Sequence, residues 1–77
     1  MSLVVSIARG VLTTQDLERV RKAVGVAEAK LREQGFTAIP SALDLRAELR
    51  RVGEHLSIPL VRQLATLARI RLADSTD

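Results

Sequence analysis

The chain has 77 residues, of which 47% are hydrophobic and only Phe36 is aromatic, and its formal net charge is +3. A chain of this length forms one domain and buries only a small core by itself. It has no cysteine, which excludes disulfides and thiolate metal sites, and its one histidine is too few for most other transition-metal sites. We therefore expect no cofactor and no metal site, and we expect the core to be completed by a second copy or by another protein.

Residues 1–12 are predicted to form an apolar arm. Their β-branched residues favour a strand, whereas Val4, Ala8 and Val11 lie at helical spacing. Both structures stay open for this segment. We favour an irregular or helical arm that packs on the body, because a strand here would find a partner strand only in a second copy of the chain.

Residues 13–35 are predicted to form the first helix. Thr13 and Asp16 have the spacing of a capping box at its start, and Gly35 is a natural terminator at its end. Its apolar residues step by three and four, which places them in one stripe along a helix. They are Leu17, Val20, Val24, Ala27 and Leu31.

Residues 41–56 are predicted to form the second helix, after a connector at 36–40. Ser41 and Asp44 repeat the capping pattern. The apolar stripe is repeated as well, at Ala42, Leu45, Leu49, Val52 and Leu56. Two stripes of this kind predict an antiparallel helical hairpin.

Residues 57–73 are predicted to form the third helix, followed by a frayed tail at 74–77. Ser57 and Pro59 mark its start. Its apolar residues span an arc of roughly 160°, which is wider than contact with one neighbour requires. We therefore expect it to cover the hairpin and also to reach a second subunit. The residues expected at this oligomer or partner interface are Leu60, Leu64, Leu67 and Ile70.

The predicted fold is an all-α, three-helix antiparallel bundle with an apolar N-terminal arm, completed by oligomerisation. The opening residues lack the positive charges of a signal peptide, and no apolar run approaches the length of a membrane span. A cytoplasmic location is therefore expected. The third helix is amphipathic but lacks Trp or Phe anchors, so membrane binding ranks low.

The segment around Gly25 has the outline of a DNA-binding helix-turn-helix, with aliphatic residues on both sides of the glycine. Arg21 stands where that motif needs a small residue, and Ala27 cannot cap a recognition helix. Because the apolar stripe runs unbroken through Gly25, we favour one continuous helix with a tolerated glycine. A ribbon-helix-helix dimer ranks lower, because the first helix is too long for that fold.

No motif brings a nucleophile, a base and an acid together, so we expect no catalytic residue and no enzyme activity. His55 is interpreted as a surface or capping histidine near the end of the second helix. Most acidic residues have basic neighbours at helical offsets and are interpreted as solvated faces. They are Asp16, Glu18, Glu28, Glu33, Asp44, Glu48 and Glu54.

Five arginines on the second and third predicted helices are candidates for a nucleic-acid patch. They are Arg46, Arg50, Arg51, Arg62 and Arg69. Such a patch would bind phosphates or an acidic protein. The small net charge and the interleaved acids favour the simpler interpretation, in which these side chains serve solubility.

The segment from Ala23 to Leu43 contains Leu31, Gly35-Phe36 and Ile39-Pro40. It resembles a helical segment common in small proteins of actinobacteria and their bacteriophages, some of which are excisionase-like. The resemblance implies a phage or mobile-element accessory protein. The residues after Pro40 depart from those relatives, because they do not show the helix-turn-helix that follows the segment there.

Together these features predict a small non-enzymatic helical interaction module that self-associates and binds a protein partner. The alternative is a DNA-binding regulator or excision accessory protein that uses the five arginines. Salt separates the two classes, because phosphate-driven binding weakens steeply as salt rises and apolar association does not.

Overall fold

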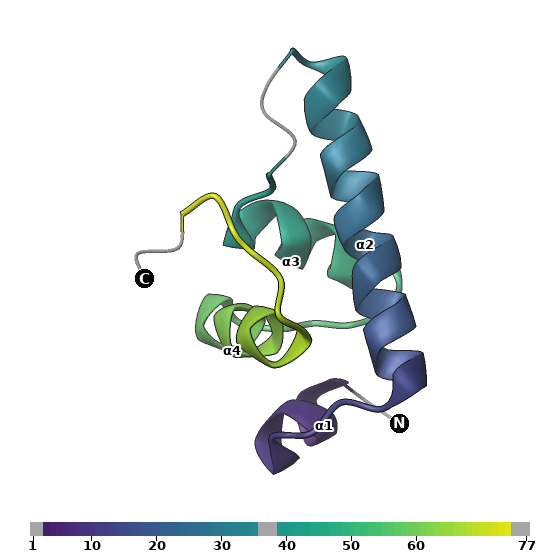
Figure 1. Ribbon diagram of the computed structural model, residues 1–77, viewed down its shortest axis with the longest axis vertical. Helices are drawn as coiled ribbons and strands as arrows, with labels where there is room; N and C mark the ends of the chain where they lie inside the picture. The colour runs from purple at the N-terminus through teal and green to yellow at the C-terminus, as the bar shows by residue number, and fades with distance from the viewer. Residues whose placement is uncertain (1–2, 36–38, 75–77) are drawn as a thin grey trace.

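The computed structural model describes residues 3–35 and 39–74. Their regular structure consists of helices α1 (Leu3–Arg9), α2 (Thr14–Glu33), α3 (Ala42–Arg51) and α4 (Ile58–Ala68) (Figure 1). The predicted all-α class is confirmed for these residues. Residues 1–2 of the arm, 36–38 of the connector and 75–77 of the tail lie outside the described residues.

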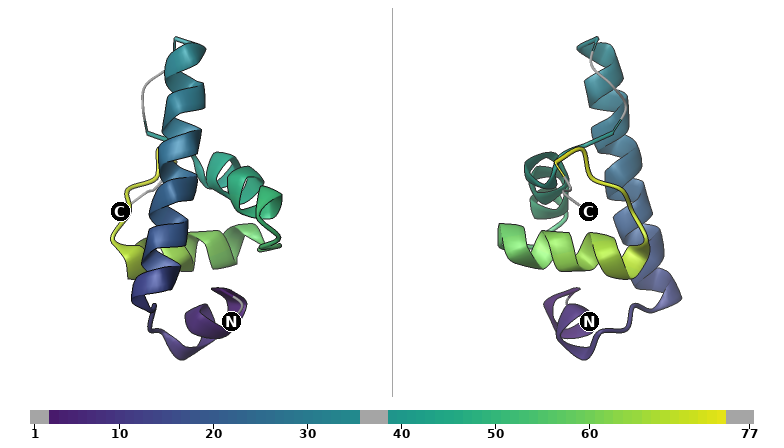
Figure 2. Two further views of the ribbon diagram at one scale, coloured as in Figure 1. Left: turned by 90° about the vertical axis from the view of Figure 1, so that its right-hand side faces the viewer. Right: turned by 60° about the vertical axis from the view of Figure 1, so that its left-hand side comes forward.

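The short helices are stacked beside the long helix α2. Figures 1 and 2 show α3, α4 and α1 in this order along α2, with α3 and α4 lying across it and the C-terminal end of α2 extending beyond them. Helix α3 packs on α2 and on α4, and α1 packs on α4. The arm is a helix that packs on the body, which is one of the forms favoured for it. The arrangement differs from the predicted antiparallel bundle because the short helices α3 and α4 cross the long helix.

The starts of the helices follow from local side-chain hydrogen bonds. Thr13 Oγ1 accepts the backbone N–H of Asp16 at 3.1 Å, and the Asp16 carboxylate accepts the N–H of Thr13 at 3.1 Å. Ser41 and Asp44 form the same reciprocal pair at the start of α3. Ser57 caps α4, as its sequence position predicts.

The ends of α3 and α4 come earlier than their apolar stripes predict. Gly53, with a φ of 88°, turns the chain after α3, and the N–H of Glu54 bonds back to the carbonyl of Leu49 at 2.9 Å. Arg69 turns the chain after α4 with a φ of 57°, and the N–H of Ile70 bonds to the carbonyl of Ala65 at 2.8 Å. A left-handed residue followed by such a back-bond is the usual helix stop.

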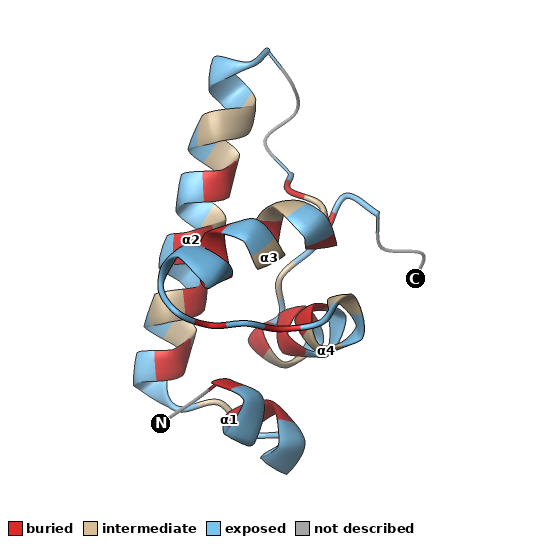
Figure 3. Cartoon of the chain, turned by 180° about the vertical axis from the view of Figure 1, so that it is seen from behind, coloured by how far each residue is buried: buried red, intermediate tan, exposed pale blue. Residues whose placement is uncertain are grey.

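The core lies where α2, α3 and α4 meet and extends to one side of α1 (Figure 3). Its buried members are Leu3, Ile7, Val20, Ala23, Ala42, Leu45, Leu49, Leu56, Val61, Leu64, Ala65, Ala68 and Leu72. Leu56 and Leu72 reach it from outside the helices. The second predicted stripe is therefore buried except at Val52, which is 59% exposed.

The chain after α4 is held across the start of α3. The carboxylate of Asp74 accepts the N–H of Ala42 at 3.1 Å and pairs with Arg62 Nη2 at 3.1 Å. The N–H of Ala73 donates to the carbonyl of Pro40 at 2.8 Å. The prediction that the frayed tail begins at residue 74 is therefore wrong, because Asp74 serves the first turn of α3.

Candidate functional site

A hollow of about 400 Å³ lies between α2 and α3, and we call it the α2–α3 groove. It is lined by Arg19, Lys22, Ala23, Val26, Glu48, Arg51 and Val52. Its floor holds two valines that the chain leaves open to solvent, Val26 at 40% and Val52 at 59% exposure. A hollow of this volume with a mainly apolar lining is a candidate binding surface.

The open floor follows from where α3 ends. Val52 continues the apolar stripe of α3, but it is the cap residue, and Gly53 turns the chain away directly after it. The side chain of Val52 therefore faces the groove beside α2. Because α3 ends there, no further helical turn covers it. Val26 lies outside the predicted α2 stripe and lines the same hollow as Val52.

Positive side chains border the groove on both helices. We call Arg19 and Lys22 of α2, with Arg51 of α3, the rim cations. The Arg51 side chain is 70% exposed and that of Arg19 is 40% exposed. Lys22 is also exposed. These side chains can bind a second carboxylate or phosphate at little desolvation cost.

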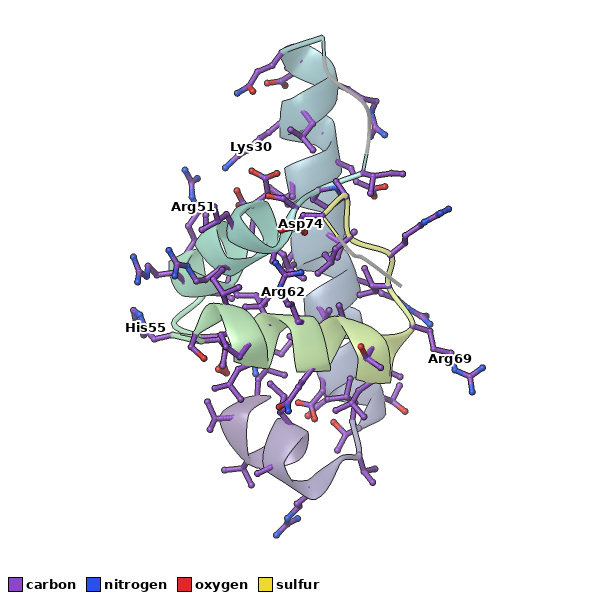
Figure 4. The ribbon with its side chains drawn as sticks, turned by 90° about the vertical axis from the view of Figure 1, so that its left-hand side faces the viewer. Lys30, Arg51, His55, Arg62, Arg69 and Asp74 are labelled. Atoms are coloured by element: carbon purple, nitrogen blue, oxygen red, sulfur yellow. The ribbon has the colours of Figure 1, made fainter. Side chains whose placement is uncertain are left out.

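Glu48 closes one end of the groove and ties its two helices together. Its carboxylate pairs with Lys30 Nζ at 2.7 Å and lies 3.9 Å from Arg51 Nε, and the side chain is only 9% exposed. Figure 4 shows Lys30 reaching from α2 toward the side on which Arg51 projects. A smaller hollow of about 110 Å³ shares Glu48 with the groove, and its other lining residues are Ala27, Lys30, Leu31, Gln34, Asp44 and Ala47.

Glu54 lies outside the groove lining but pairs with one of the rim cations. Its carboxylate accepts the N–H of Leu3 at 3.2 Å and pairs with Arg19 Nη2 at 3.3 Å. The residue is 7% exposed. One carboxylate thus holds the first residue of α1 and orients a rim cation, using a residue of the α3–α4 connector.

Asp16 is a third buried carboxylate, at 4% exposure. The Ser6 hydroxyl donates to its Oδ2 at 2.7 Å, and the N–H of Thr13 donates to the same atom. The hydrogen bond from Ser6 is the largest cause that lowers the pKa of Asp16, followed by the N–H of Thr13, while burial acts in the opposite direction. For Asp16, Glu48 and Glu54, the interpretation as solvated acids is therefore wrong.

The predicted interface residues, three on α4 and Ile70 just after it, pack within the chain itself. Leu64 is 0% exposed, within the core. Leu60, Leu67 and Ile70 are half-buried and pack against that core. Leu64 is therefore corrected from an interface position to a core position, because α4 is covered by α1 and α3.

The five predicted arginines do not form one surface. Figure 4 shows Arg51 and Arg69 projecting at opposite ends of the view, with Arg62 between them beside Asp74. Arg62 forms an ion pair with Asp74, and Arg69 forms the turn after α4. Arg46 is half-buried and Arg50 is exposed on α3. Of the five, only Arg51 belongs to the α2–α3 groove.

The helix-turn-helix outline around Gly25 is not realised. Helix α2 is continuous through Gly25, and a Cβ at that position would meet nothing within 4 Å. His55 is exposed in the connector after α3 and not within a helix end, because α3 ends at Arg51.

No three His, Cys, Asp or Glu side chains gather as metal ligands within residues 3–35 and 39–74. Among the helices of those ranges, none combines the length and the apolar character that crossing a bilayer requires.

No protein family, curated protein or solved structure gives a significant match to this chain. The candidate site therefore rests on the geometry of the α2–α3 groove.

The sequence predicts the groove only in part. Val52 stands in the second stripe, and Gly53 directly after it is a signal that the helix stops there. Val26 is an apolar residue off the first stripe. Read together, these signals could have indicated the exposed floor, whereas the rim cations are set by how α3 crosses α2.

Proposed function

We propose that this protein is a small non-enzymatic helical interaction module that binds a protein partner in the α2–α3 groove. The observation that carries the proposal is the pair of exposed valines, Val26 and Val52, on the floor of a hollow between two packed helices. Grooves between helices accept the apolar side of a further helix. Burial of the two valines would supply apolar contact that the chain does not provide for itself.

A selection experiment tests this function. The full chain is immobilised and used to select from a displayed library of amphipathic helices with randomised charged positions. The proposal expects helices whose binding is lost with Val52→Asp and kept with Val11→Asp. Val11 is the matched control, because it is 67% exposed and lies outside the groove lining. A library without binders, or binders indifferent to Val52→Asp, would contradict the proposal.

Self-association is a separate part of the proposed function. Leu60, Leu67 and Ile70 offer a second copy only their outer edges, because they pack on the core. Sedimentation velocity over a range of protein concentrations tests self-association directly, and a constant monomer mass would remove this part. A role as a phage or mobile-element accessory protein is supported by the sequence resemblance alone.

DNA binding is the second candidate function. The observation that favours it is the exposed side of α4, where Arg62, Gln63 and Thr66 share one region of the surface. Arginine can bind guanine and glutamine can bind adenine through paired hydrogen bonds to the base edge. Binding would require Arg62 to leave Asp74. A mobility-shift titration at two salt concentrations tests this function, and the absence of a shift at low salt excludes it.

A further inference from the structure

The α2–α3 groove combines an apolar floor with positive charge on both borders. Arg19 and Lys22 stand on the α2 side and Arg51 stands on the α3 side. We infer that the occupant is an acidic amphipathic helix of a partner protein, with its apolar side on Val26 and Val52 and its carboxylates on the rim cations. This inference deepens the proposed function and rests on it.

The rim cations retain exposed N–H donors that can bind carboxylates of a partner. Arg51 is 3.9 Å from Glu48 and its side chain is 70% exposed, so most of its guanidinium faces solvent. Arg19 uses Nη2 for Glu54, which leaves its other N–H donors. Lys22 is exposed, and in the described part of the chain it takes part in no ion pair. Carboxylates placed along both borders would therefore find donors.

The one acidic residue in the lining does not cancel this charge. The Glu48 side chain is 9% exposed and already pairs with Lys30 at 2.7 Å. An approaching carboxylate meets the exposed rim before it meets Glu48. The formal net charge of +3 adds attraction at longer range.

The shape of the groove favours a helix as the occupant. On α2 its lining runs from Arg19 to Val26, which is about 10 Å of helix at 1.5 Å per residue, or about two turns. A helix lying there presents residues at i, i+3, i+4 and i+7 to the floor. An added β-strand needs a sheet edge, and residues 3–35 and 39–74 contain no strand. A polyproline segment docks between aromatic side chains, and among the described residues the lining of the groove contains none.

The experiment uses two fluorescent peptides of about four helical turns that share one leucine stripe. One carries glutamates beside the stripe and the other carries lysines. Fluorescence anisotropy with the full-length protein measures both affinities. We expect the glutamate peptide to bind about tenfold more tightly than the lysine peptide, since several exposed charge pairs contribute together.

A charge exchange provides the matched test. Lys22→Glu with Arg51→Glu should reverse the preference, so that the lysine peptide becomes the better ligand. Arg21→Glu with Arg71→Glu makes the same change in net charge at exposed positions outside the groove, and should leave the preference unchanged. If circular dichroism shows that the first double variant is unfolded, Lys22→Glu alone is used. This variant should reduce the ratio of the affinity for the glutamate peptide to that for the lysine peptide.

Two further results would overturn different parts of the account. Equal or tighter binding of the lysine peptide to the wild-type protein, abolished by Val52→Asp, would overturn the acidic occupant and leave the groove as the binding site. Binding of either peptide that survives Val52→Asp would overturn the proposed function itself. Displacement of the glutamate peptide from the wild-type protein by duplex DNA, together with equal affinity of that DNA for wild-type protein and for Val52→Asp, would place the cations in a nucleic-acid site instead.

Discussion

Ser6 on α1 donates a 2.7 Å hydrogen bond to Asp16, the residue that completes the capping box of α2. Both residues are buried, at 3% and 4% exposure. The carboxylate therefore has two roles, because it caps α2 and fixes α1 against the start of α2. The position of α1 depends on the first turn of α2 being formed.

This pair predicts a loss of stability in acid. The folded pKa of Asp16 is lower than its ordinary value of 3.8, so the unfolded chain binds more protons than the folded chain at pH values around and between the two pKa values. The free energy of unfolding should therefore fall as the pH drops from about 5 through the folded pKa. Ser6→Ala removes the largest cause of the shift and should reduce this loss. Urea unfolding at about pH 6 and about pH 3 measures it in both proteins. Equal losses in wild type and Ser6→Ala would contradict the account.

A second prediction concerns Glu54 and the N-terminus of α1. Glu54→Ala leaves the N–H of Leu3 and the Arg19 guanidinium without their carboxylate, at a cost of about 1–3 kcal/mol. Amide hydrogen exchange should show that the backbone amides of α1 lose protection, while the amides of α2 and α3 keep theirs. Glu18→Ala, at an exposed position, is the control. Unchanged protection of α1 in Glu54→Ala would show that the apolar contacts with α4 and the Ser6–Asp16 hydrogen bond hold α1 without Glu54.

A third prediction concerns Gly25. Gly25→Ala should raise the free energy of unfolding by about 1 kcal/mol, because the position is helical and exposed, with nothing near an added methyl group. Gly53→Ala should have the opposite effect, because the φ of 88° strains any residue with a Cβ. Thermal unfolding of both variants measures the difference. A destabilised Gly25→Ala would indicate that α2 is interrupted there.

A fourth prediction concerns Arg69, which has a left-handed backbone where glycine is favoured. Arg69→Gly should stabilise the fold by about 1 kcal/mol, because the left-handed conformation costs a residue with a Cβ about that much. Arg71→Gly, at a neighbouring exposed position, should not stabilise it. Chemical denaturation of the two variants compares them, and a destabilising Arg69→Gly would mean that the side chain itself holds the turn.

The capping motifs in the sequence predict the starts of α2 and α3 correctly. Thr13 with Asp16, and Ser41 with Asp44, need only residues three apart in the chain, and both pairs form as expected. The ends of α3 and α4 were predicted too late, because the apolar stripes continue beyond them. Leu56 does reach the core, but from the connector and not from a helix.

The buried carboxylates of Glu48 and Glu54 have partners that residue spacing within one helix does not predict. Glu54 stands four residues after Arg50, yet its carboxylate bonds to Leu3 and Arg19, which are 51 and 35 residues away in the chain. Glu48 likewise pairs with Lys30 across the two helices. Such partners depend on how the helices cross. The apolar periodicity of a single segment does not predict this crossing.

The most direct test of the account is to map where the glutamate-flanked peptide binds on the ¹⁵N-labelled protein by NMR titration. The account predicts that amide shifts concentrate on Arg19–Val26 of α2 and Glu48–Val52 at the end of α3, and that Val52→Asp abolishes them. Shifts confined to the exposed side of α4 around Arg62 and Thr66, or a spectrum unchanged by saturating peptide, would contradict it.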